Sequence, residues 1–426
     1  MAAAPQLPLE TGRAIDAWVE AHADEMLAFA SRLVQTPSEN RPPRGDERAA
    51  QELLAETLKS FGAEVDMFDV TDVPGITEHP AYLEGRHYAG RPNVVGRFAG
   101  RGGGRSLIFS SHMDTAPRDP LPWRKTEPFS GEIKDGKLWG RGSFDMKGGL
   151  AASLWGILAA RAVAPQLRGD LFLESVVDEE WGGANGTLAA RLRGYTADAA
   201  IIPEPTGLQI CPEHWGAHLY RLTVPGSAGM VFGNPHLQNP IYTSMLFIDA
   251  LREWEKEYHA RPAPPMYAGG PKPPFMVTAI EARQYGIPRT CTVDFAVSFS
   301  KEDDPDEMDR RARQTVEQAF AGIAFGDEKP RIERLFRYLP ASSVPEGHPI
   351  LATVTEAFRS AGDLPCVVRG APFQCDAFMF NLHSPTPALI LGPDGAGAHA
   401  ADEYVTVDSL INLVRVYART IILWCT

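Results

Sequence analysis

The chain contains four short apolar runs, and a loop with ionisable side chains follows each of them. The first run, residues 107–109, leads into Ser-Ser-His-Met-Asp, and the other runs are residues 171–177, 199–202 and 389–391. Short apolar runs bounded by glycine, proline and polar residues predict buried strands. Because ligands of α/β folds bind outside the carboxyl ends of the strands, this repeated pattern predicts a functional site at one edge of a sheet.

The remaining sequence predicts an α/β fold with two domains. Apolar residues follow helical spacing over residues 11–35, 46–61 and 407–423. From residue 215 the sequence pattern changes and predicts a separate helix–strand–strand–helix segment. We therefore expect a mostly parallel central sheet with flanking helices, plus an inserted smaller α/β domain. The expected boundaries are 1–213 and 334–426 for the first domain, and 214–333 for the inserted one.

Composition excludes several other classes of protein. A net charge of −13 over 426 residues argues against nucleic acid or an anionic membrane as partner. An odd number of scattered cysteines, without a CxxC pair, indicates neither a disulfide framework nor a thiolate zinc site. The N-terminal residues lack the features of a signal peptide, and no apolar run reaches the ~18 residues of a membrane span. We therefore expect a cytoplasmic protein.

The loops after the apolar runs supply the candidate site residues. In an extended chain His112 and Asp114 would point to the same side, so that the carboxylate could orient the ring. Asp145 precedes an Ala/Leu-rich helix, where it could equally be a plain helix N-terminal charge. A solvated acidic turn is the alternative reading of Asp178, Glu179 and Glu180. The further candidates after strands are Glu204 and His399.

Imidazole and carboxylate ligands together suit particular metal ions. Such a set favours Zn²⁺, Mn²⁺ or Co²⁺ over metals that prefer thiolates. A carboxylate that bridges two ions ~3.5–4 Å apart is the arrangement of two-metal hydrolases.

Five motifs then resemble one family. The segments SHMDTAP, GRGSFDMKGG, DEEWGG, PEPT and GAHAADEYV occur in this order. The chain is similar, from about residue 34 onward, to the M20 metallopeptidase family, which includes carboxypeptidase G2, acetylornithine deacetylase, succinyl-diaminopimelate desuccinylase and aminoacylase.

The resemblance implies a role for each residue of these motifs. His112 and Glu204 would bind one ion, while Glu180 and His399 would bind the other. Asp145 would bridge both ions, Asp114 would support His112, and Glu179 would be the general base. Asp178 receives no role. The resemblance also implies that the inserted domain is a lid and commonly forms a homodimer contact.

The lid departs from the family pattern. Met230 stands where relatives usually carry a histidine that holds the oxyanion. The candidates to replace it are His236 and His218, and the alternative is that these two histidines are only structural. Ser298 stands where an arginine is common. Arg289 follows a rigid proline and could clamp a substrate carboxylate, or it could form an ordinary surface ion pair. Tyr285 and Phe232 would make the pocket flatter and more apolar.

These departures leave two functions open. The simpler one is metal-dependent hydrolysis of a C–N bond in a small carboxylate-bearing substrate, such as an N-acyl amino acid or a peptide. Loss of an oxyanion donor typically raises the activation free energy of acyl transfer by ~2.7–4 kcal/mol. Hydrolytic deamination of an aromatic amine such as 5-nitroanthranilate, which needs no oxyanion donor, is therefore the alternative. A non-catalytic metal-binding or ligand-binding relative is the third possibility, although Glu179 and all five ligand positions are retained.

Overall fold

The computed structural model describes residues 6–118, 120–182, 184–227, 229, 237–284, 286–335 and 338–426. The chain divides into two units, of which the first contains Met1–Glu213, Ser343–Ala371 and Cys375–Thr426. The second unit contains His214–Ser342 and Pro372–Gln374. The chain thus returns to the first unit at residue 343, nine residues after residue 334, the position expected from the sequence.

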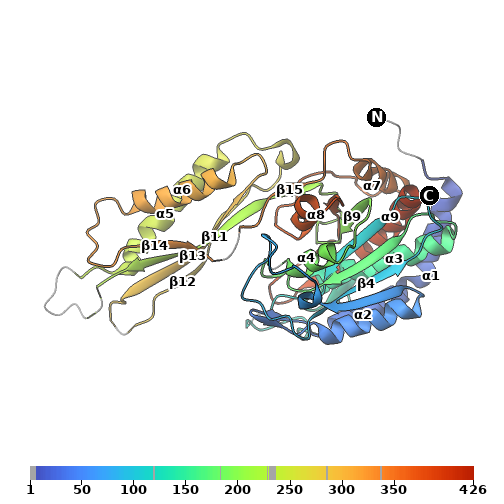
Figure 1. Ribbon diagram of the computed structural model, residues 1–426, viewed down its shortest axis with the longest axis horizontal. Helices are drawn as coiled ribbons and strands as arrows, with labels where there is room; N and C mark the ends of the chain where they lie inside the picture. The colour runs from blue at the N-terminus through green and yellow to red at the C-terminus, as the bar shows by residue number, and fades with distance from the viewer. Residues whose placement is uncertain are drawn as a thin grey trace. The chain divides into compact units, whose positions relative to one another are not determined.

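A six-stranded sheet forms the centre of the first unit (Figure 1). Its strands, in spatial order, are β16 (Ala388–Ile390), β9 (Ala199–Ile202), β5 (Leu107–His112), β8 (Leu171–Val176), β4 (Pro92–Phe98) and β3 (Glu64–Asp69). The first four are parallel, whereas β4 and β3 are antiparallel to their neighbours. Every residue of β5 and β9 is buried, as expected for strands of a parallel sheet with both faces covered.

Helices cover this sheet. They are α1 (Leu9–Val34), α2 (Arg48–Ser60), α3 (Gly148–Val163), α4 (Asn185–Leu192), α7 (Pro349–Ser360), α8 (Ala377–His383) and α9 (Val407–Cys425). α3 packs against both α1 and α9, and α2 packs against β3 and β4. Gly156 of α3 allows the close approach to α9, because a Cβ atom there would lie 2.7 Å from Tyr417.

Short elements complete the first unit near the ends of the long strands. A four-stranded sheet consists of β17 (Gly395–Ala396), β18 (Tyr404–Thr406), β7 (Lys137–Trp139) and β6 (Ile133–Lys134). β1 (Asn40–Arg41) pairs with β2 (Arg44–Gly45). The strands β10 (Glu213–His214) and β15 (Ser342–Ser343) pair with each other where the chain leaves and re-enters the first unit, so each belongs partly to the second unit. Two short helical turns are η1 (Val70–Asp72) and η2 (Ser143–Lys147). β18 and β7 thereby bring the segments that follow His399 and precede Asp145 side by side.

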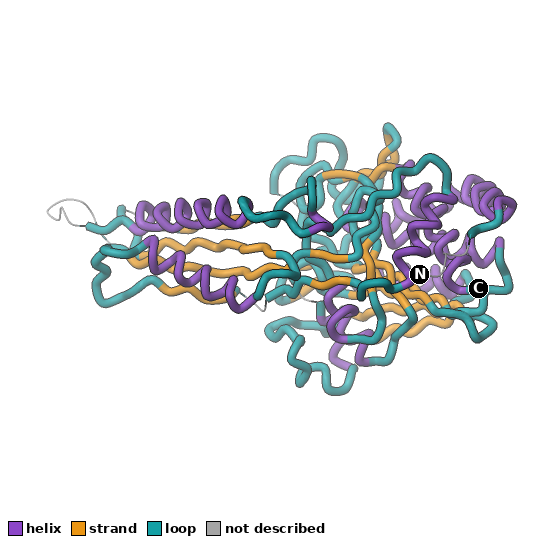
Figure 2. Tube along the Cα trace, turned by 90° about the horizontal axis from the view of Figure 1, so that it is seen from above, coloured by secondary structure: helices purple, strands orange, loops and turns teal. Residues whose placement is uncertain are grey.

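The second unit is a four-stranded antiparallel sheet with two long helices along it (Figure 2). The strands, in spatial order, are β12 (Phe275–Glu281), β13 (Thr290–Phe299), β11 (Gly216–Pro225) and β14 (Arg331–Arg334). The helices are α5 (Pro240–His259) and α6 (Pro305–Ala319), with the turn η3 (Pro265–Tyr267) between α5 and β12. Asp304 caps α6 by accepting the N–H of Asp306, and Pro305 occupies its first turn.

The predicted fold class is confirmed: the chain has a mostly parallel central sheet with flanking helices and a second, smaller α/β unit. The long helices lie within a few residues of their predicted bounds. In the described part of the chain, no helix is long and apolar enough to cross a membrane.

Candidate metal centre

His112 is the last residue of β5, and its ring is fixed by the backbone that follows. Its Nδ1–H donates to the carbonyl oxygen of Asp114 at 2.8 Å, so that Nε2 faces the site. The carboxylate of Asp114 lies farther away, with Oδ1 at 3.8 Å from Nδ1. The predicted support of His112 by Asp114 therefore runs through the main chain, because the strand ends at His112 and the alternation of side chains does not continue.

The carboxylate of Asp114 instead organises the acidic turn after β8. It accepts the backbone N–H groups of Glu179 at 3.2 Å and Glu180 at 3.1 Å. Asp178, the first residue of that turn, has a positive φ of 67°. These bonds direct the two glutamates that follow it toward His112.

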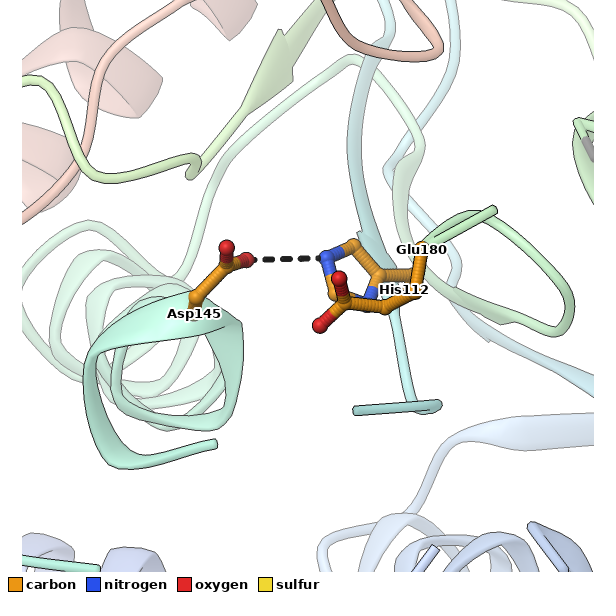
Figure 3. Close-up of side chains that lie close together, drawn as sticks. All are labelled: His112, Asp145 and Glu180. Carbon is orange, nitrogen blue, oxygen red and sulfur yellow. Dashed lines mark hydrogen bonds and ion pairs between the residues drawn. The ribbon is translucent and has the colours of Figure 1, made fainter. Parts of the chain in front are cut away.

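Asp145 lies between the two histidines. Its Oδ1 is 3.1 Å from Nε2 of His112, and its Oδ2 is 3.2 Å from Nε2 of His399. Figure 3 shows the carboxylate of Asp145 facing the His112 ring, with Glu180 beside it. One carboxylate thus offers a separate oxygen to each imidazole.

Glu180, Glu204 and Glu179 complete the cluster. Glu180 Oε2 lies 2.7 Å from His399 Nε2, and its Oε1 accepts the N–H of Ala116 at 2.7 Å. Glu204 Oε1 and Glu179 Oε2 lie 3.6 Å and 3.8 Å from His112 Nε2. The structure therefore brings together all five predicted ligand residues and the predicted base.

The charges of this cluster do not balance. Four carboxylates face only two imidazoles, and the glutamates are removed from solvent. Burial raises the pKa of Glu179 and of Glu204 well above its usual range, and neighbouring carboxylates raise it further. Asp145 is the exception, because hydrogen bonds to His112 and His399 outweigh its burial and lower its pKa. Hydrogen bonds to Asp145 and Glu180 raise the pKa of His399 to about 11.

This donor set fits divalent cations. Two groups of side chains have ligand atoms within 4.8 Å of one another: His112 with Asp145 and Glu180, and His112 with Glu179 and Glu204. Carboxylate oxygen and imidazole nitrogen are ligands of Zn²⁺ and similar ions, and positive charge would offset the surplus of carboxylates.

Sequence reasoning missed several residues that position these groups. Glu403 Oε1 accepts the N–H groups of Phe144 and Asp145 at 3.0 and 3.1 Å, and its Oε2 pairs with Arg141 at 2.6 Å. Glu403 stands in the motif that carries His399, which was the available signal. Asn40 contacts Asp114 and Asp178, but its own segment carries no periodic pattern that could have identified it.

The structure describes only some of the residues predicted for the lid. His236 and Tyr285, together with Met230 and Phe232, lie outside the described residues. Arg289 belongs to the second unit, where its side chain is exposed and its backbone N–H donates to Gln284. His218 is buried among aromatic rings and its Nε2–H donates to the carbonyl of Pro305 at 2.8 Å, which is a structural role. Ser298 is buried in β13 opposite Ala217.

Comparison with known proteins identifies the family. A family model described as "Peptidase family M20/M25/M40" matches residues 108–423. The chain is 27% identical to N-formyl-4-amino-5-aminomethyl-2-methylpyrimidine deformylase of Bacillus subtilis, over 96% of each chain.

Solved structures share the fold. The di-peptidase Dug1p from Saccharomyces cerevisiae superposes with a TM-score of 0.76 at 15% identity, over 97% of this chain and 98% of that one. YXEP of Bacillus subtilis, described as a dinuclear metal binding peptidase of the M20 family, gives a TM-score of 0.63 at 15% identity, over 95% and 99%. The chain therefore belongs to peptidase family M20/M25/M40, and it is a hydrolase of carbon–nitrogen bonds.

Proposed function

We propose that the chain is a two-metal hydrolase. In this proposal His112 and Glu204 would hold one cation, Glu180 and His399 would hold the other, and Asp145 would be shared between them. The observation that carries the proposal is the placement of the two Asp145 oxygens, each of which faces a different histidine at 3.1–3.2 Å. A carboxylate in this position suits a bridge between two ions.

The reaction adds water across a C–N bond and yields a carboxylic acid and an amine. Two divalent cations such as Zn²⁺, Mn²⁺ or Co²⁺ would, when bound, lower the pKa of water towards ~7 and stabilise developing negative charge. Glu179 is the general base, whose Oε2 accepts a proton from the attacking water and returns it to the departing nitrogen. Its position 3.8 Å from His112 Nε2 supports this role.

We infer that the substrate is a small N-acyl compound that carries a carboxylate. The deformylase and di-peptidase activities named for relatives support amide hydrolysis. Arg289, exposed in the second unit, is the candidate partner for the substrate carboxylate. Hydrolytic deamination of an aromatic amine is the second candidate; it rests on Met230 and Tyr285 in the sequence, and the activities named for the relatives do not support it.

We also propose that the chain forms a homodimer through the second unit. β12 lies at the edge of its sheet and exposes Met276, Val277 and Ile280, and α5 exposes Tyr242, Met245 and Leu246. Tyr242, Met245 and Leu246 follow helical spacing on one face of α5. An unpaired edge strand with apolar side chains is a surface that a second copy would cover.

The test is a substrate screen with controlled metal content. The protein is stripped with a chelator, reloaded separately with Zn²⁺, Mn²⁺ and Co²⁺, and assayed with N-formyl and N-succinyl amines, dipeptides and 5-nitroanthranilate. We expect two bound ions per chain and metal-dependent release of amine, both reduced in Asp145→Asn. Turnover of nitroanthranilate alone would favour deamination, and activity that survives complete metal removal would overturn the two-metal proposal.

A further inference from the structure

The side chain of Asn40 is buried between the carboxylates of Asp114 and Asp178, which lie next to the candidate metal centre. Its Nδ2 donates to Asp114 Oδ2 at 2.8 Å and to Asp178 Oδ1 at 3.0 Å. Because both neighbours are carboxylates, the orientation of the amide is fixed by chemistry: only an N–H₂ group can satisfy both. One side chain thereby joins the loop after β5 to the turn after β8.

The backbone of Asn40 makes the same two connections. Its N–H donates to the carbonyl of Thr115 at 2.9 Å, and its carbonyl accepts the indole N–H of Trp181 at 3.1 Å. Asn40 therefore contacts both ends of the acidic turn, Asp178 and Trp181, as well as the loop that follows His112.

The charges around Asn40 explain why an amide occupies this position. Asp114 is already bound to the backbone N–H groups of Glu179 and Glu180. On its other side, Asp178 accepts the Tyr88 hydroxyl at 2.6 Å and lies 3.6–3.7 Å from Arg86 and Arg91. A neutral donor separates the two buried carboxylates, which would otherwise repel each other.

We propose that Asn40 is a positioning residue that locks residues 112–116 and 178–181 into the geometry required for metal binding. Asn40 is not one of the proposed ligand residues, and it acts through Asp114 and Asp178 on His112, Glu179 and Glu180. The proposal rests on the two-metal function proposed above. It also gives Asp178 a role: its carboxylate receives the second N–H of Asn40.

The test compares isosteric variants. Asn40→Leu removes both donors at similar volume, and Asn40→Asp replaces the donor by a third carboxylate. Gln51→Met is the matched control, because Gln51 is equally buried and its amide donates to a backbone carbonyl, that of Ser175, at 3.1 Å. For each variant, Zn²⁺ and Mn²⁺ binding to the stripped protein is measured by calorimetry, together with thermal unfolding, kcat and KM.

We expect both Asn40 variants to bind metal about 10- to 100-fold more weakly, the range typical for loss of a partner that orients ligands. Asn40→Asp should be the weaker binder, and kcat should fall with KM changed less than threefold. Gln51→Met should keep metal affinity and kcat within threefold. Parent-like metal affinity in a folded Asn40→Leu protein would overturn the proposal.

Two further outcomes are distinguished. If Asn40→Leu does not fold, we measure Asn40→Ser, which keeps one short donor. Parent-like metal affinity of Asn40→Ser overturns the proposal. Failure of Asn40→Ser to fold also overturns it, because Asn40 would then be required for the fold. If the parent protein binds no metal, the proposed function has failed, whatever the variants do.

Discussion

The two units of this protein place their charged side chains differently. The first unit buries ion pairs: Glu47 with Arg91, Arg141 with Glu403, and Glu174 with Arg191. The second unit keeps pairs such as Arg221–Asp294 and Arg261–Asp303 partly exposed, and its core is built from aromatic and aliphatic side chains.

The difference indicates what the buried charges are for. Desolvation makes a buried ion pair a poor source of stability, and an apolar replacement is often as stable. In the first unit, Arg141–Glu403 holds the backbone of Asp145, and Arg91 lies behind Asp178. The second unit has no such site among its described residues, and it stabilises itself by apolar burial. The buried charged side chains of this molecule therefore lie in the unit that carries the candidate metal centre.

The largest effect should come from Glu179, the proposed general base. Glu179→Gln keeps the size of the side chain but removes the proposed base, and we expect kcat to fall about 10²- to 10⁴-fold. Metal stoichiometry, measured by elemental analysis, should remain at the parent value. The control is Glu333→Gln on exposed β14 of the second unit, which should leave kcat within twofold; an equal loss there would remove the distinction between the units.

Breaking a buried pair should cost stability. Arg91→Met leaves Glu47 without its guanidinium partner and removes one of the two guanidinium groups near Asp178, and we expect the free energy of unfolding to fall by about 3–5 kcal/mol. Burial already raises the pKa of Glu47 to about 7 against the effect of Arg91. The double variant Glu47→Leu with Arg91→Met should regain part of the loss in urea unfolding; no recovery would contradict the desolvation argument.

In the second unit, the buried ionisable side chain whose effect on stability can be tested is His214. Burial lowers its pKa to about 4, while Nδ1–H donates to the carbonyl of Trp215 and Nε2 accepts the Ser342 hydroxyl. As the pH falls, the unfolded chain, whose histidine pKa is near 6.5, takes up a proton at a higher pH than the folded protein does. The free energy of unfolding should therefore fall as the pH drops from about 6.5 to 4. The full loss is about 3 kcal/mol below pH 4.

This pH dependence is measured as the shift in urea midpoint between pH 7 and pH 4.5. His214→Gln removes the titrating group and should show a smaller shift than the parent protein. Equal shifts would mean that His214 does not resist protonation in the folded state.

The smallest effect is expected at the surface of the second unit. Arg221 on β11 lies opposite Asp294 on β13, and the arginine is substantially exposed. Arg221→Ala should lower the free energy of unfolding by only about 0.2–1 kcal/mol, and less in 1 M salt, because solvent and ions screen the pair. A loss as large as that of Arg91→Met would show that burial does not separate the two classes of pair.

Much of the site could be predicted because its residues follow strongly apolar strands. Strands β5 and β9 could be predicted directly from the sequence. Because their carboxyl ends lie at the same edge of the sheet, His112 and Glu204 could be predicted to lie close together. What could not be predicted depends on contacts between distant segments. Asn40 meets Asp178 only in the folded molecule, and its sequence neighbours carry no signal for that contact.

Other elements escaped prediction for local reasons. β14 has exposed Arg and Glu side chains and only one apolar residue, so it lacks the alternation that marks a strand. α8 is a single short helix, below the length at which helical periodicity is recognisable. The β-bulge between Val277 and Ala279 depends on pairing with β13 and leaves no mark in the sequence of β12.

The contacts of Asp145 also bear on how the protein is made. Its backbone is held by Glu403 and its second oxygen by His399, although both lie far downstream in a chain of 426 residues. During translation, most of the first unit leaves the ribosome before these two residues exist. The proposed pair of cation sites therefore lacks His399 and the support of Glu403 until these residues have been synthesised, long after His112 and Asp145.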